Sequence, residues 1–161
     1  KKSRLGLRGL KSIMAQLTQG ALAAMIDHTL LKPEASRHEV EKLCREAEEN
    51  SFAAVCVAGY RVNEARRLVQ NPKIKICAVI GFPLGSCRSE IKAMETVRAI
   101  ADGAEEVDMV INIGAVKDAN WAQVQNDISA VVKAARGVLV KVILETCLLT
   151  NEEIVKCCHL A

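Results

Sequence analysis

Five short apolar runs, each followed by a helical pattern, constrain the fold of this chain more than any other feature. Their centres lie near residues 28, 55, 78, 109 and 142, so they recur about every 30 residues, the size of one βαβ unit. Strands that alternate with helices in this way are typical of a parallel sheet with right-handed crossovers. The sequence therefore predicts the α/β fold class.

Polar residues inside the strand-like runs help to choose between two α/β architectures. An open doubly wound sheet keeps its active residues at the strand ends. A (β/α)₈ TIM barrel with a polar lumen carries them at alternating positions within strands, and a complete barrel needs about 250 residues. The alternating pattern favours a barrel, of which 161 residues would cover about the first five βα units plus an N-terminal helix. The pairs that show it are Asp27 and Thr29, Asp108 and Asn112, and Lys141 and Glu145.

The start of the chain differs from the rest. Five basic residues and no acid occur by Lys11, and apolar residues recur at helical spacing through Leu17. A transit peptide has this composition, but a helix that packs ahead of the domain is the simpler interpretation. We predict an N-terminal helical extension over residues 1–24 and a partial TIM-barrel domain over residues 25–161.

Composition argues against several classes of partner. The net charge of +3 and an aromatic content of 2% favour neither a basic nucleic-acid surface nor a base-stacking platform. No apolar run reaches the roughly 18 residues that span a bilayer. We therefore expect neither nucleic acid nor membrane as a partner.

The seven cysteines indicate a reducing compartment. Their number is odd and no Cys-x-x-Cys pair occurs, so a disulfide framework is not expected and a cytoplasmic location is. Adjacent residues on a helix diverge by about 100°, so Cys157, Cys158 and His159 cannot close on one metal ion. No metal site is predicted.

Asp108 stands inside an apolar run that otherwise has the pattern of a buried parallel strand. A carboxylate there costs several kcal/mol unless it is paired or hydrogen-bonded. Alternation along the strand places Asp108, Val110 and Asn112 on one face and Met109 on the other. Taken alone, Asp108 fits a structural network and an active site equally well.

Lys141 is the second unusual residue, because it lies in an equally apolar run. Desolvation lowers the pKa of a lysine, and a neutral amine is a nucleophile for carbonyl groups. Lys141 could thus form a Schiff base, or an ion pair with Asp108, or with Glu145 two residues further on. The residues favour the ion pair or a proton-relay role slightly. Cys56 reads mainly as a small core residue, with a lumen-facing position as the alternative.

Five segments in order, from about residue 25 to the C-terminus, resemble the deoxyribose-phosphate aldolase family. The segments are Ile26-Asp-His-Thr-Leu-Leu-Lys-Pro33, Ala54-Val-Cys-Val57, Val79-Ile-Gly-Phe-Pro-Leu-Gly85, Gly103-Ala-Glu-Glu-Val-Asp-Met-Val-Ile-Asn-Ile-Gly-Ala115 and Val140-Lys-Val-Ile-Leu-Glu-Thr-Cys147.

The resemblance implies a (β/α)₈ barrel and a class I aldolase without metal or cofactor. Such a lyase of deoxyribose phosphate and nucleoside catabolism cleaves 2-deoxy-D-ribose 5-phosphate reversibly to acetaldehyde and D-glyceraldehyde 3-phosphate through a lysine Schiff base. The substrate is a small phosphorylated sugar. Asp108 matches the aspartate of proton transfer, and Asp27, Thr29, Cys56 and Lys141 match positions of the substrate pocket.

The sequence also departs from the family pattern. The resemblance places the Schiff-base lysine on the sixth strand, in a Lys-Thr-Ser-Thr-Gly segment, and the phosphate loops on the last three strands; none of these occurs among the 161 residues. We therefore expect this chain to be inactive alone and, having two free sheet edges, to self-associate as a homo-oligomer. One alternative is a non-catalytic, truncated relative that acts as an interaction or regulatory module. Another is a monomeric, flavodoxin-like open sheet that binds a small ligand or partner.

Overall fold

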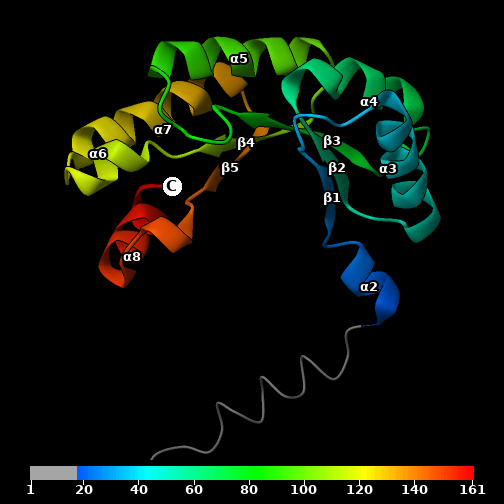
Figure 1. Cartoon of the computed structure of the whole chain (residues 1–161), viewed down its shortest axis with the longest axis horizontal. Helices are drawn as coiled ribbons and strands as arrows, with labels where there is room; N and C mark the ends of the chain where they lie inside the picture. Colours follow the sequence, from blue (N-terminus) through cyan, green and yellow to red (C-terminus); the bar gives the residue numbers. More distant parts are fainter. Residues whose placement is uncertain (1–17) are drawn as a thin grey trace, which may run out of the picture.

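The computed structural model describes residues 18–161. Most of the predicted N-terminal extension lies outside these residues, and the proposed domain boundary stays a prediction. Strands and helices alternate along the described chain (Figure 1). The elements are α2 (Gln19–Ala23), β1 (Asp27–Leu30), α3 (Arg37–Asn50), β2 (Ala54–Val57), η1 (Gly59–Arg61), α4 (Val62–Leu68), β3 (Lys75–Ile80), α5 (Ser89–Ala101), β4 (Glu106–Val110), α6 (Ile113–Lys117), α7 (Trp121–Ala135), β5 (Leu139–Ile143), η2 (Thr146–Leu148) and α8 (Asn151–Leu160).

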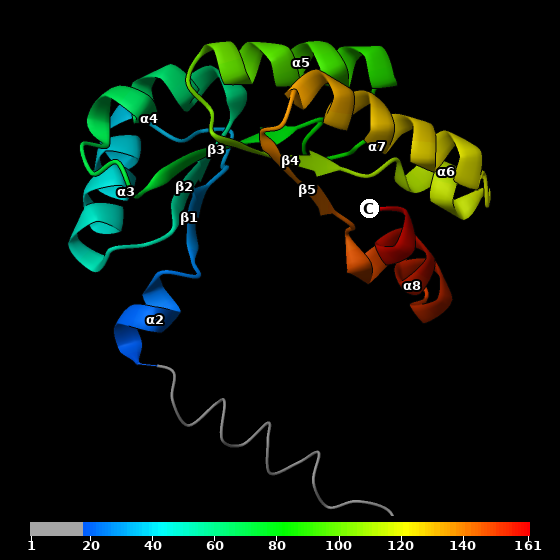
Figure 2. The ribbon, with the colours of Figure 1, turned by 180° about the vertical axis from the view of Figure 1, so that it is seen from behind.

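The five strands form one parallel sheet in the order β1-β2-β3-β4-β5. Each strand therefore pairs with the next one in the chain, as in a barrel, whereas a doubly wound sheet reverses direction at a switch point. Helices α3, α4, α5 and α7 lie around the outside of the curved sheet, as the two opposite views show (Figures 1 and 2). The partial-barrel prediction is confirmed, and the flavodoxin-like alternative is wrong.

The two faces of the sheet carry different side chains. Val107, Met109 and Ile111 belong to a large apolar core between the sheet and its outer helices. The inner face has a small apolar cluster made of Ala54, Cys56, Cys77 and Val79, against which Leu31 and Ile143 pack. Because alternate residues of a strand point to opposite faces, residues such as Asp108 and Lys141 are directed to the inner side.

Helix boundaries follow their capping signals. Ser36 and Glu39 form a capping box at the start of α3, and Thr150 and Glu153 form another at α8. Two helices follow β4, the short α6 and then α7, and the sequence pattern indicated only the second of them. Asn112 caps the first, because its Oδ1 accepts a hydrogen bond from the Ala115 N–H at 3.0 Å. The predicted place of Asn112 within the strand is therefore wrong: β4 ends at Val110, and Asn112 begins the following helix instead.

The glycine- and proline-rich loop after β3 packs against the end of β4. Gly85 has a φ of +64°, and a Cβ atom there would lie 2.1 Å from the carbonyl oxygen of Ile111. The Gly81 N–H donates to Glu95 Oε2 at 2.7 Å. The absence of a side chain at Gly85 thus lets the loop backbone pack directly against the backbone at the end of β4.

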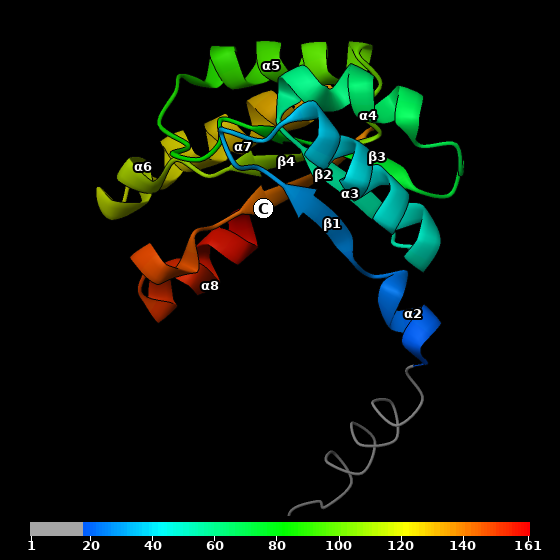
Figure 3. The ribbon, with the colours of Figure 1, turned by 45° about the vertical axis from the view of Figure 1, so that its right-hand side comes forward.

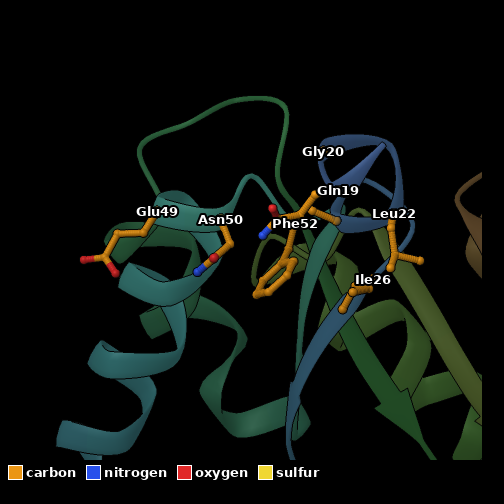
Figure 4. A pocket seen from close by; sticks show the side chains of 8 residues that line it. Gln19, Gly20, Leu22, Ile26, Glu49, Asn50 and Phe52 are labelled. Atoms are coloured by element: carbon orange, nitrogen blue, oxygen red, sulfur yellow. The ribbon is translucent and has the colours of Figure 1, made fainter. Parts of the chain in front are cut away.

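The first and last described helices adjoin the ends of the outer strands: α2 leads into the start of β1, and α8 follows the end of β5 (Figure 3). A cavity of about 460 Å³ lies between α2 and the end of α3, and Phe52 is one of the residues that line it. Glu49 points away from the Phe52 ring (Figure 4), so the cavity brings no charged groups together. Across residues 18–161, no helix is both long and apolar enough to traverse a bilayer.

Candidate active site

The ammonium of Lys141 lies among three carboxylates on the inner face of the sheet. Its Nζ donates to Asp27 Oδ2 at 2.8 Å and to Glu106 Oε2 at 2.7 Å, and it lies 3.2 Å from Asp108 Oδ1. The Lys141 side chain is 37% exposed and that of Asp108 is 15% exposed. We call these four residues the Lys141 cluster.

Strand register explains part of this cluster. Asp108 of β4 is the direct register partner of Lys141 of β5. Glu106 lies two residues before Asp108 and therefore shares its face. Asp27, however, comes from β1 at the opposite edge of the five-stranded sheet. Its contact with Lys141 shows that the sheet curves enough to bring side chains of its first and last strands together.

The contacts of Lys141 keep its amine charged. Burial acts to lower its pKa, but hydrogen bonds to Asp27 and Glu106 outweigh this effect and raise the pKa above the ordinary lysine value. A permanently charged ammonium is a poor nucleophile. The geometry of Lys141 is that of an ion pair, with Asp27 and Glu106 as its hydrogen-bonded partners and Asp108 close by. Glu145 is not among them: it is exposed and accepts a hydrogen bond from Cys147 Sγ at 3.1 Å.

Asp108 is less well satisfied than its neighbours. Burial raises its pKa, and the charge of Lys141 offsets part of that rise. Although Oδ1 is close enough to Lys141 to form an ion pair, the angles are not those of a hydrogen bond, and this buried oxygen has no hydrogen-bond partner among the described residues. Oδ1 therefore retains the capacity to accept a hydrogen bond from a bound molecule.

The structure brings Asp27, Asp108 and Lys141 into direct contact. Cys56 is buried on the same inner face. Thr29 is exposed, and its hydroxyl donates to the Asp27 carbonyl at 2.8 Å rather than to the cluster.

Two residues of this region were not predicted from the sequence. Glu106 stands just before the apolar run that starts at Val107, so the apolar pattern does not indicate it, although its spacing from Asp108 places both on one face of β4. Cys77 was not singled out in the sequence, yet its Sγ lies 3.8 Å from Lys141 Nζ. Only the register of β2 and β3, which pairs Cys56 with Cys77, reveals that it belongs here.

The sequence model of the DeoC/LacD family of aldolases matches residues 21–157. This chain belongs to that family. Its similarity to the deoxyribose-phosphate aldolase of Clostridium perfringens is 57% identity over 141 residues, which cover 87% of this chain and 63% of that relative. The chain thus spans less than two thirds of the length of this curated relative.

Solved structures agree with the family assignment. A putative deoxyribose-phosphate aldolase from Coccidioides immitis superposes with a TM-score of 0.86 at 38% identity, covering 89% of this chain and 57% of that one. The deoxyribose phosphate aldolase of Aeropyrum pernix, described as having a unique tetrameric structure, gives a TM-score of 0.83 at 31% identity, covering 94% of this chain and 64% of that one. The five-stranded arc of this member of the DeoC/LacD family therefore corresponds to part of a longer aldolase.

Proposed function

We propose that this chain provides part of the active site of a deoxyribose-phosphate aldolase. The reaction would be the reversible cleavage of 2-deoxy-D-ribose 5-phosphate to acetaldehyde and D-glyceraldehyde 3-phosphate. The observation that carries the proposal is the Lys141 cluster, a charged constellation on the inner face of a curved parallel sheet whose sequence belongs to this aldolase family.

Each member of the cluster has a role in this proposal. Asp108 transfers a proton, since its partly buried Oδ1 has no hydrogen bond to give up when it meets a substrate hydroxyl or a water molecule. Lys141 remains an ammonium and orients Asp108 and the substrate's polar groups. Asp27 and Glu106 fix the position of Lys141 through hydrogen bonds, while Thr29 and Cys56 line the pocket.

The Schiff-base lysine and the phosphate-binding loops lie outside these 161 residues in this proposal. The chemistry needs neither a metal nor a cofactor, because the protonated imine itself withdraws electrons from the bond that breaks. It follows that the chain alone should bind substrate weakly and not turn it over.

We further propose a cytoplasmic protein that self-associates. All seven cysteines are free, a state that a reducing compartment preserves. Strands β1 and β5 are the outer strands of the described sheet, and an outer strand offers unpaired backbone groups to another chain. The tetramer described for the Aeropyrum relative is compatible with such an assembly.

A complementation experiment tests the aldolase proposal. The chain would be assayed alone and fused to the segment of the Clostridium relative that lies beyond the part it matches. Acetaldehyde release would be followed through its reduction by NADH and alcohol dehydrogenase. We expect no turnover from the chain alone and clear turnover from the fusion.

Substitutions in the fusion assign the activity to the cluster. Asp108→Asn should lower kcat by about 100-fold or more, as expected for the loss of a proton-transfer group. Glu49→Gln, on the exposed last turn of α3, is the matched control and should leave kcat unchanged. A folded fusion without activity would instead favour the non-catalytic interaction module.

A further inference from the structure

Two thiols and a carboxylate converge beside the Lys141 cluster. The Sγ atoms of Cys56 and Cys77 and a carboxylate oxygen of Asp108 all lie within 4.8 Å of one another. They come from three neighbouring strands, β2, β3 and β4. Cys56 and Cys77 are register partners, so their side chains lie side by side on the inner face, where both residues are buried.

We propose that Cys56, Cys77 and Asp108 bind one thiophilic divalent cation of the zinc class. Two thiolates and one carboxylate form a donor set that zinc accepts, with a fourth position left for water or another small molecule. Harder cations such as Mg²⁺ prefer oxygen ligands throughout. This site does not depend on the aldolase reaction, because it needs only the three side chains of this chain.

The charges around the three ligands favour a cation. Three carboxylates, those of Asp27, Glu106 and Asp108, face the single ammonium of Lys141. Lys141 Nζ lies 3.8 Å from Cys77 Sγ, but its hydrogen bonds to Asp27 and Glu106 offset its charge. The surplus of negative charge attracts a divalent ion into this partly buried region.

Binding of the cation requires only a small movement of the side chains, but it also requires deprotonation of the thiols. Zinc–sulfur bonds of about 2.3 Å draw the ligand atoms to within about 4 Å of each other, so ligand atoms that lie within 4.8 Å of one another need to close by at most about an ångström. Asp108 Oδ1 gives up no hydrogen bond on doing so. The Cys77 thiol is held protonated by a hydrogen bond with Cys56 and by burial, which raise its pKa. The cation must therefore displace thiol protons, and we expect weaker affinity than at a dedicated structural zinc site.

Cation binding would also bear on catalysis. A cation held by the Asp108 carboxylate would compete with the proton transfer that the proposed aldolase mechanism assigns to this group. If the aldolase proposal is correct, zinc should inhibit the fused enzyme at the concentrations that fill this site. Direct binding and inhibition are separate measurements, so failure of one proposal can be distinguished from failure of the other.

Cadmium titration of this chain tests the site directly. Cd²⁺ is a suitable probe because its bonds to thiolates give an ultraviolet charge-transfer absorption. The background protein would carry Ser at the three cysteines that are at least partly exposed, positions 87, 147 and 158, which removes adventitious thiols. We expect this protein to bind one Cd²⁺ per chain with the thiolate absorption, and Zn²⁺ to displace it.

Single substitutions then locate the ion. Cys56→Ala and Cys77→Ala should each weaken Cd²⁺ binding at least tenfold, and Asp108→Asn should weaken binding while leaving most of the thiolate absorption. Cys44→Ala is the matched control, since Cys44 is buried in the core on the helical side, and should bind as the background does. Absorption that persists in both Cys56→Ala and Cys77→Ala would overturn the proposal.

A measurement without substitutions of the ligands covers the case in which these variants do not fold. Cadmium NMR of the background protein reports the number of sulfur ligands through the chemical shift of the ion. A single resonance with two sulfur ligands supports the site. Absence of a bound resonance, or one with oxygen and nitrogen ligands only, refutes it.

Discussion

Lys92 Nζ lies 2.5 Å from Asp127 Oδ2, and this ion pair joins α5 to α7 with both side chains almost completely buried. The ammonium also donates to the Val110 carbonyl at the end of β4, at 2.8 Å. The other carboxylate oxygen accepts a hydrogen bond from the Ser89 hydroxyl at 2.8 Å. Two outer helices and the strand that carries Asp108 are therefore connected through one buried cation.

Removing one partner of this pair should be strongly destabilising. Asp127→Leu leaves a buried ammonium without its counter-charge and should lower the free energy of unfolding by about 3–5 kcal/mol. Lys92→Met combined with Asp127→Leu should recover most of that loss, because neither charge remains. Urea denaturation of both variants and the parent measures the coupling. For comparison, Lys117→Met breaks the partly exposed pair with Glu153 and should cost at most about 1 kcal/mol.

Gly85 should tolerate no side chain. Gly85→Ala places a Cβ against the Ile111 carbonyl, and backbone atoms cannot move aside as a flexible side chain does, so we expect a loss of more than about 1 kcal/mol. Gly137→Ala is the control, since Gly137 also has a positive φ, +95°, but a Cβ there meets nothing within 4 Å. Equal losses of thermal stability in the two variants would show that backbone strain, not the clash, dominates at residue 85.

Lys141 should resist Schiff-base trapping. After incubation of the chain with acetaldehyde and borohydride, we expect no stoichiometric adduct at Lys141, because its hydrogen bonds to Asp27 and Glu106 keep the amine charged. Intact-mass analysis followed by peptide mapping gives the answer, with the active fusion as positive control. An adduct mapped to Lys141 would mean that the nucleophile is in this chain after all.

Acid should weaken the two capping boxes. Hydrogen bonds from Ser36 lower the pKa of Glu39, and the Lys117 ammonium together with Thr150 lowers that of Glu153, both from a reference of 4.5. A lowered folded-state pKa gives stability that is present above 4.5 and is lost as pH falls through the lower folded value. Thermal melting of Glu39→Gln and Glu153→Gln between about pH 6 and pH 3 should show a smaller acid-induced drop than the parent. An unchanged pH profile in both variants would contradict this account.

Local patterns predicted the elements well. Short apolar runs located the five strands, and alternation along them directed Asp108 and Lys141 to one face. The two capping boxes mark the starts of α3 and α8. These signals depend only on residues that are close together in the sequence, so they can be recognised without knowledge of the tertiary structure. The short helix α6 was not predicted, because Ile113 looks like a continuation of the apolar run of β4.

Long-range relationships could not be predicted in the same way. The contact of Asp27 with Lys141 depends on the curvature of the whole sheet, and no sequence period encodes that curvature. Lys92 and Asp127 sit in helices, where charged residues are normally solvated, so nothing in the sequence distinguishes them from surface residues. The family resemblance directed attention to the inner face, but neither Glu106 nor Cys77 was among the site residues matched through it.

The curvature of the sheet also bears on the order in which contacts form during folding. The hydrogen bond between Asp27 and Lys141 closes a separation of 114 residues, whereas every strand pairing joins consecutive strands. Contacts between residues so far apart in the sequence form late. The conformational entropy of the intervening chain must be lost before the contact contributes any favourable free energy. The charged centre should therefore be the last part of the arc to assemble, and a spectroscopic probe at Asp27 would report completion of folding rather than its onset.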